Sequence, residues 1–159
     1  MEPQVVTLEP MILGGISLRT SAAQMGTPEA GGIPAMWQRF RAENVPAKFS
    51  RRTDDERAFG VMYDYGANDS FSVLAGVRLI DDTDFPEGFE RVEVPAAKYL
   101  AFESEKGPLH EVMPKVWTDA HAYLAEHPEY QPAGTFDLES YVMRQADEGP
   151  ATVYIALMG

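Results

Sequence analysis

Cysteine is absent from this chain of 159 residues, which excludes disulfide bonds and metal sites built on thiolates. Basic residues are also scarce, since 13 Lys and Arg stand against 25 Asp and Glu and give a formal net charge of −12. A protein that binds nucleic acid needs a basic face to neutralise phosphates, so we expect no direct nucleic-acid contact. An acidic surface either attracts cationic partners over long range or simply keeps the protein in solution, and the charge alone leaves both interpretations open.

Long apolar runs are missing as well. No stretch approaches the roughly 20 apolar residues that a membrane-spanning helix needs, and residues 1–4 lack the basic and apolar character of a signal peptide. We therefore expect a cytoplasmic protein without membrane contact. The hydrophobic fraction of 45% still suffices for a sizeable core, and 159 residues fit one compact domain or two small fused modules.

The sequence signatures of common cofactor and metal sites are absent too. The chain contains no GxSxG motif, no phosphate-binding Walker loop and no dinucleotide fingerprint. His110, His121 and His127 do not have the spacing of zinc ligands. We expect neither a metal nor a cofactor.

Hydrophobic periodicity predicts the order strand, helix, strand, strand in both halves of the chain, with one further strand at the start of the first half. The first half is predicted to contain strands at residues 5–8 and 11–19, a helix at 33–40, and strands at 59–65 and 71–79. The second half is predicted to contain a strand at 92–103, a helix at 113–124, and strands at 136–143 and 152–158.

Each predicted helix begins with a similar motif. Residues 33–37 are IPAMW and residues 113–117 are MPKVW, which share the pattern apolar, Pro, variable, apolar, Trp. Together with the repeated order of elements, this motif argues for internal duplication. We predict an α+β fold in which a single domain, residues 1–159, consists of two βαββ modules (about residues 1–83 and 84–159) in a pseudo-twofold arrangement. A central cleft between the two sheets would then be a natural site for a small molecule.

Glu139 is the first candidate for chemistry. Alternation divides its strand into two faces, with Phe136, Leu138 and Val142 on one and Asp137, Glu139, Tyr141 and Met143 on the other. If the first face packs on a helix, Glu139 faces the cleft or solvent. In a cleft its carboxylate could pair with a ligand cation, while each aromatic face adds about 0.5–2 kcal/mol of cation–π attraction. Desolvation would also raise the pKa of Glu139, which suits acid/base catalysis.

Aromatic and sulfur-containing side chains could line the same cleft. A buried tyrosine needs a partner for its hydroxyl, so several strand tyrosines on one face suggest a pocket lining as readily as a core. Tryptophans on helix faces and methionines in gaps are explained at least as well by ordinary core packing. Besides Glu139, the candidate ligand-binding residues are Tyr141, Tyr99, Tyr63, Trp37, Trp117, Met143 and Phe71.

The chain resembles the GyrI-like family, the effector-binding domain that also occurs fused to AraC-type and MerR-type regulators. The matching pieces are, in order, residues 33–40, 59–65, 71–79, 94–102, 107–108, 114–117, 129–132 and 136–141. The most diagnostic feature is a Glu two residues before a Tyr in the penultimate strand, here Glu139 and Tyr141. The resemblance implies two βαββ modules of the SHS2 type around a cleft that binds lipophilic, often cationic drugs or dyes. It also implies that Glu139 is the acid of that cleft, with Tyr141 and Trp117 matching its aromatic residues.

Three functions are compatible with this resemblance. The first is binding of small, lipophilic, cationic aromatic molecules without reaction. The second is hydrolysis of reactive electrophilic small molecules, with Glu139 as the catalytic acid or base. The third is a protein partnership with DNA gyrase or a regulator, which we rank last because the negative charge is scattered along the chain. Since the fused regulators carry an added DNA-binding domain that this chain lacks, we expect no direct control of transcription.

Overall fold

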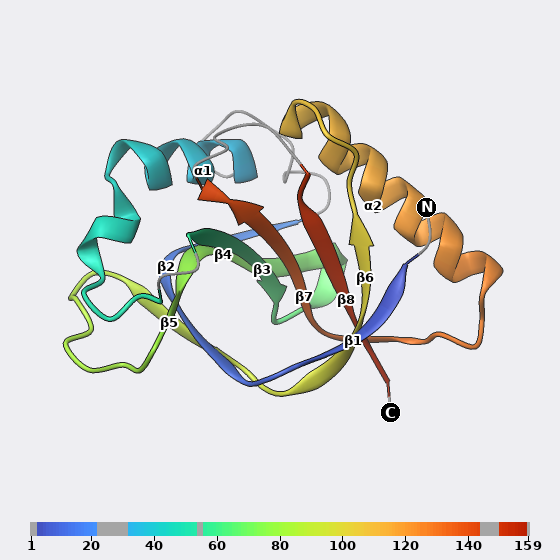
Figure 1. Ribbon diagram of the computed structural model, residues 1–159, viewed down its shortest axis with the longest axis horizontal. Helices are drawn as coiled ribbons and strands as arrows, with labels where there is room; N and C mark the ends of the chain where they lie inside the picture. The colour runs from blue at the N-terminus through green and yellow to red at the C-terminus, as the bar shows by residue number, and fades with distance from the viewer. Residues whose placement is uncertain (1–2, 22–31, 54–55, 144–149, 159) are drawn as a thin grey trace.

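The computed structural model describes residues 3–21, 32–53, 56–143 and 150–158 (Figure 1). The first half contains β1 (Gln4–Leu8), β2 (Met11–Ser21), α1 (Ile33–Ala42), the 3-10 helix η1 (Val45–Lys48), β3 (Arg57–Tyr63), the 3-10 helix η2 (Ala67–Asp69) and β4 (Ser70–Leu79). The second half contains β5 (Glu90–Val94), β6 (Ala97–Glu103), α2 (Leu109–Glu126), β7 (Pro132–Val142) and β8 (Thr152–Leu157). The predicted helices and strands are present, with two notable differences in their boundaries.

Both differences involve proline. The single strand predicted at 92–103 is two strands, β5 and β6, separated at Pro95, which has no N–H to donate to a sheet ladder. Helix α2 begins at Leu109, earlier than predicted, so Pro114 lies inside the helix rather than in its first turn. Each half of the chain therefore has the order strand, strand, helix, strand, strand.

All eight strands form one antiparallel sheet, in the order β1-β6-β8-β7-β3-β4-β2-β5. At its centre β3 pairs with β7, from Arg57 opposite Val142 to Tyr63 opposite Phe136. Exchanging each element of the first half for its counterpart in the second leaves this order unchanged, so the topology is pseudo-twofold about the β3–β7 pair. The predicted α+β class is confirmed. The two expected sheets are one continuous sheet, because the β3–β7 ladder joins them.

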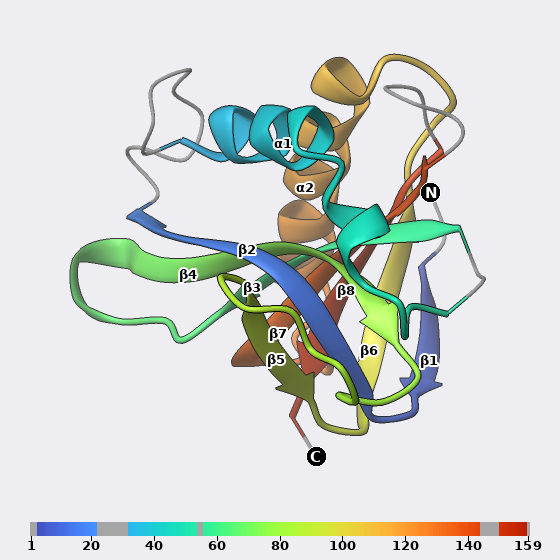
Figure 2. The ribbon, with the colours of Figure 1, turned by 90° about the vertical axis from the view of Figure 1, so that its left-hand side faces the viewer.

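Both helices cover the same face of the sheet (Figures 1 and 2). Helix α1 packs on β2 and β4, and helix α2 packs on β6. The core beneath α1 includes Met36, Phe40, Phe71, Val73 and Val77. The core beneath α2 includes Leu100, Phe102, Met113, Val116 and Ala120. Within the described ranges of the chain, neither helix is long and apolar enough to cross a membrane.

The opposite face of the sheet has a core of its own. Leu13, Val61, Tyr99 and Leu138 belong to one cluster on this side, around which the strongly curved sheet bends (Figure 1). Leu138 is completely buried there, while Glu139 points to the helix side of the sheet and bonds to a residue of α2. The Leu138 face of β7 thus packs away from the helices, which reverses the arrangement considered from the sequence. A slip of one residue would exchange these faces and place the Glu139 carboxylate in the apolar cluster of Leu13, Val61 and Tyr99, so burial fixes the register that places Glu139 beneath α1 and α2.

Candidate ligand-binding site

Glu139 and Gly60 lie directly opposite each other on the two central strands, β7 and β3. A Cβ atom at residue 60 would lie 3.2 Å from Glu139 Oε1 and 3.3 Å from Cζ2 of Trp37 on α1. Glycine at this position therefore leaves space for both the carboxylate and the indole ring. We call this region the inter-helix site and define it by Trp37, Gly60, Trp117, Glu139 and Tyr141.

Two aromatic residues hold the Glu139 carboxylate. The Trp117 indole N–H of α2 donates to Oε2 at 2.5 Å, and the Tyr141 hydroxyl, two residues along the same strand, donates to Oε1 at 2.5 Å. Each carboxylate oxygen thus accepts one hydrogen bond and keeps a further acceptor position. These bonds fix the carboxylate beneath the helices and leave it able to interact with another group.

The two tryptophans reach the site from opposite helices. Trp37 and Trp117 occupy the fifth position of the two IPAMW-like motifs, so the repeat supplies one indole from each helix. The Trp37 ring meets the Tyr141 ring edge to face, with centroids 5.3 Å apart and an interplanar angle of 75°. Trp117 packs against both the α1 and the α2 clusters. Aromatic rings consequently surround the carboxylate on the helix side of the sheet.

The carboxylate has no strong basic partner. Within the described part of the chain, no Lys or Arg forms an ion pair with Glu139. Burial raises the pKa of Glu139 above its ordinary value, and the hydrogen bonds from Tyr141 and Trp117 offset only part of this effect. Although the Glu139 side chain keeps some access to solvent, protein atoms enclose its carboxylate. A carboxylate in these surroundings is stabilised either by a proton or by an incoming cation.

Tyr141 remains a hydrogen-bond donor over the ordinary pH range. Burial raises the pKa of its hydroxyl, and the neighbouring negative charge of Glu139 raises it further. Tyr141 therefore stays neutral and keeps donating to Glu139. With Trp37, Trp117 and Tyr141 packed around the carboxylate, a bulky ligand can reach it only if some of these rings move.

Two further predicted residues lie on the helix side of the sheet. Phe71 is buried in the core beneath α1, and Met143, immediately after β7, packs against that same core. Met143 also lines a cavity of about 760 Å³ together with residues such as Phe49, Arg52 and Glu56. Neither Phe71 nor Met143 contacts the Glu139 carboxylate through a hydrogen bond, so both would act on a ligand only through apolar contact.

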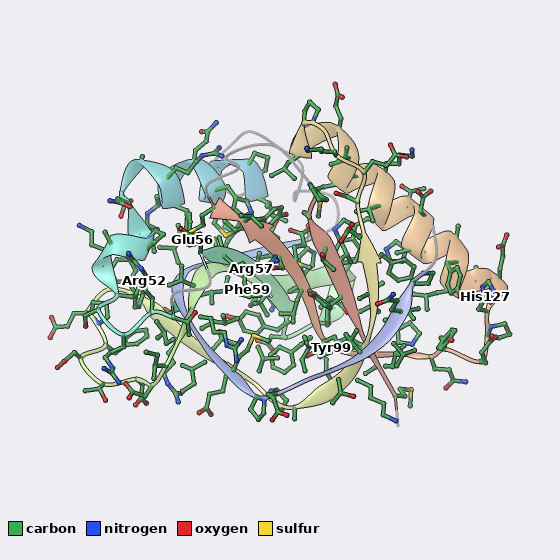
Figure 3. The ribbon with its side chains drawn as sticks, viewed as in Figure 1. Arg52, Glu56, Arg57, Phe59, Tyr99 and His127 are labelled. Carbon is green, nitrogen blue, oxygen red and sulfur yellow. The ribbon has the colours of Figure 1, made fainter. Side chains whose placement is uncertain are left out.

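The remaining two predicted residues, Tyr63 and Tyr99, lie on the other face. Tyr63 stacks on Phe136 with centroids 6.1 Å apart, and Tyr99 is 1% exposed in the cluster that contains Leu138. Figure 3 shows Tyr99 on the side of the sheet away from the helices. Burial raises the pKa of Tyr99 to about 12. The sheet separates these two tyrosines from Glu139, so the structure does not bring them into the inter-helix site.

Three residues near Glu139 were not among the predicted site residues. Asp137 lies on the same face of β7, as the alternation indicated, and accepts a hydrogen bond from the Tyr65 hydroxyl through Oδ2. His121 stacks on Trp117, with centroids 5.8 Å apart. The alternation could have identified Asp137, whereas Tyr65, predicted as the last residue of a strand at 59–65, lies beyond the end of β3 at Tyr63. Among the described residues, no three His, Asp or Glu side chains gather as a metal site would require.

Known proteins share this fold. The chain is 26% identical over 147 residues to the YobU protein of Bacillus subtilis (strain 168), covering 90% of this chain and 89% of that protein. It also matches the crystal structure of the integron cassette protein VCH_CASS2 from the Vibrio cholerae mobile metagenome, with a TM-score of 0.77, 22% identity and coverage of 98% of this chain and 95% of that one. A structure of SAV2435 bound to tetraphenylphosphonium matches with a TM-score of 0.79, 18% identity and coverage of 100% and 95%.

The family comparison covers almost the whole chain. Residues 4–157 match the family described as Cass2, integron-associated effector binding protein. This family is related to the GyrI-like effector-binding domains, so the family resemblance predicted from the sequence is confirmed. The chain belongs to the Cass2 family of integron-associated effector-binding proteins.

Proposed function

We propose that this protein binds lipophilic organic cations at the inter-helix site, with Glu139 as the counter-ion. The proposal depends mainly on one observation. The Glu139 carboxylate lies among Trp37, Trp117 and Tyr141 and has no Lys or Arg partner in the described part of the chain. The likeness to SAV2435, whose structure is bound to tetraphenylphosphonium, supports the same class of ligand.

The charge of Glu139 favours a cation over a neutral molecule. An enclosed carboxylate has lost much of its hydration when the protein folds. A cation that pairs with it compensates for this loss, which a neutral ligand does not. A phosphonium or quaternary ammonium group has no N–H to donate, and therefore does not compete with Trp117 and Tyr141 as donors to Glu139. The hydrogen bonds that position the carboxylate can persist in the complex.

The aromatic rings favour a lipophilic ligand. Each ring face can add about 0.5–2 kcal/mol of cation–π attraction, and burial of apolar ligand surface contributes about 25 cal/mol per Å². A micromolar dissociation constant corresponds to about 8 kcal/mol. One enclosed ion pair, two or three ring contacts and apolar burial are sufficient for that affinity.

Binding should be measured by calorimetry with tetraphenylphosphonium and with triphenylphosphine oxide, a neutral molecule of similar aromatic character. We expect Glu139→Gln to weaken the affinity for the cation at least about tenfold, which corresponds to about 1.4 kcal/mol. The affinity for the neutral compound should change by no more than about twofold in the same variant, because this compound makes no ion pair.

Glu103→Gln is the matched control. Glu103 is an exposed residue of β6, so this variant makes the same change in net charge away from the site. It should bind the cation like the unchanged protein. Equal weakening of the cation and the neutral compound in Glu139→Gln, or equal effects of the two Glu→Gln changes, would refute the role of Glu139 as a counter-ion.

A further inference from the structure

A second carboxylate, Asp137, lies along β7 on the same face as Glu139. Asp137 and Glu139 are two positions apart, so their backbones are separated by about 7 Å, because an antiparallel strand advances by about 3.4 Å per residue. The Asp137 carboxylate accepts hydrogen bonds from the Tyr65 hydroxyl at Oδ2 and from the backbone N–H of Ala156 at Oδ1, the latter at 3.3 Å. Asp137 thus has the same kind of setting as Glu139: a carboxylate held by neutral donors, one of them a tyrosine.

The charge of Asp137 is also left without a strong basic partner. No Lys or Arg pairs with it among the residues that the structure describes. Burial raises the pKa of the Asp137 carboxyl, while Tyr65, Ala156 and His121 lower it. Each oxygen accepts one hydrogen bond and keeps a position for a second interaction.

Aromatic side chains lie beside both carboxylates. Trp117 bonds to Glu139 and stacks on His121. The Tyr65 hydroxyl donates to Asp137, and the Tyr65 ring lies against the Phe71 ring, with ring centroids 6.0 Å apart. Tyr65 is 42% exposed and Asp137 itself is partly exposed, so solvent reaches the Asp137 end of this surface.

We propose that the inter-helix site extends along β7 to Asp137, and that it prefers elongated aromatic dications whose two positive groups pair with Glu139 and Asp137. The inference rests on the proposed function, because it requires Glu139 to act as a counter-ion. Two carboxylates on one face of a strand repel each other when both are ionised, and a rigid dication relieves this repulsion while a monocation neutralises only one charge. The spacing of the two acids therefore selects for charge number and length.

The test compares two rigid probes of nearly the same shape. Methyl viologen carries a positive charge on each of its two rings, and N-methyl-4-phenylpyridinium carries one charge only. We expect the unchanged protein to bind the dication at least about tenfold more tightly. Asp137→Asn should remove this preference and leave the affinity for the monocation within about threefold. Glu139→Gln should weaken the binding of both probes, and Glu103→Gln should leave the ratio of the two affinities unchanged.

The outcomes separate this inference from the proposed function. Equal affinity of the unchanged protein for the two probes would overturn the extended site, even if the monocation still depends on Glu139. If Asp137→Asn weakened both probes equally, Asp137 would act on binding in general and not on the second charge. If neither probe nor tetraphenylphosphonium bound, the proposed function itself would fail. Should Asp137→Asn not fold, Asp137→Glu keeps the charge and must retain a preference for the dication.

Discussion

The Trp117 indole N–H donates to Glu139 Oε2 across a distance of 2.5 Å, and this bond links helix α2 to the central strand pair. It also ties the repeat to the site, because Trp117 and Trp37 come from equivalent motifs of the two halves. Of the two tryptophans, Trp117 donates to Glu139, whereas Trp37 contacts Tyr141 through its ring. The two equivalent tryptophans therefore have different roles, and substitution can separate them.

Trp117→Phe should shift the pH dependence of cation binding upward. The change keeps an aromatic ring but removes the donor that stabilises the charged form of Glu139, so the pKa of the carboxyl rises further. A hydrogen bond to a charged group contributes about 1.5–3 kcal/mol, which sets the scale of the effect. Titration of tetraphenylphosphonium binding against pH measures the midpoint directly.

Trp37→Phe is the matched control for that experiment. It removes a similar ring area but no hydrogen bond to Glu139, so affinity should fall while the pH midpoint stays in place. The same upward shift in both variants would mean that the loss of ring packing, and not the loss of the donor, alters the carboxyl group.

The faces of individual strands could be predicted from the sequence. Period-two alternation placed Glu139, Tyr141 and Met143 on one face, and all three lie on the helix side of the sheet. Side chains within a strand are related by local backbone geometry, so no knowledge of the partner strands is needed. Alternation fails where the strand ends. Tyr65 leaves the face of Tyr63 because Asp64, with a φ of 56°, turns the chain toward Asp137.

The relation between strands could not be predicted in this way. Tyr63 and Tyr99 were expected near Glu139, and assigning their face requires the pairing of β3 with β7 and of β6 with β8. Register between strands depends on the whole buried pattern and cannot be read from one segment. The β3–β7 pairing also joins the expected two sheets into one and brings Gly60 opposite Glu139. The role of Gly60 became visible only in the assembled sheet.

Stability and ligand affinity should respond to pH in opposite directions. Burial raises the pKa of Glu139 above its ordinary 4.5, so the folded protein holds this proton more tightly than the unfolded chain. The free energy of unfolding that Glu139 contributes is therefore fully present below the unfolded pKa and is lost as pH rises through the folded pKa. Cation binding needs the ionised carboxylate and should strengthen over the same interval.

Urea unfolding of the unchanged protein and of Glu139→Gln, from pH 4.5 to about pH 8, tests the stability half of this prediction. The free energy of unfolding should fall less steeply with pH in the variant, because glutamine does not titrate. Asp137, whose pKa burial also raises, titrates in both proteins, so the difference between them isolates Glu139. Parallel pH profiles for the two proteins would contradict the burial of an ionisable Glu139.

Gly60→Ala tests whether ligand binding needs Glu139 and Trp37 in their observed positions. The new methyl group would lie 3.2 Å from Glu139 Oε1 and 3.3 Å from Trp37 Cζ2, closer than ordinary contact, so both groups must shift by a few tenths of an ångström. Alanine restricts the unfolded backbone and gains about 0.5–1 kcal/mol, which offsets part of an overpacking cost of about 1–3 kcal/mol. We therefore expect a small change in the melting temperature and a loss of cation affinity of about tenfold.

The control for this variant is Gly66→Ala. A methyl group there would meet the side-chain ends of Arg19 and Ser70, which lie outside the inter-helix site. In calorimetry, Gly66→Ala should bind tetraphenylphosphonium with the same affinity as the unchanged protein, and Gly60→Ala should bind it more weakly. If Gly60→Ala bound the cation as tightly as Gly66→Ala, the ligand would not need Glu139 and Trp37 in their observed positions. In that case the cation would have to bind elsewhere on the protein.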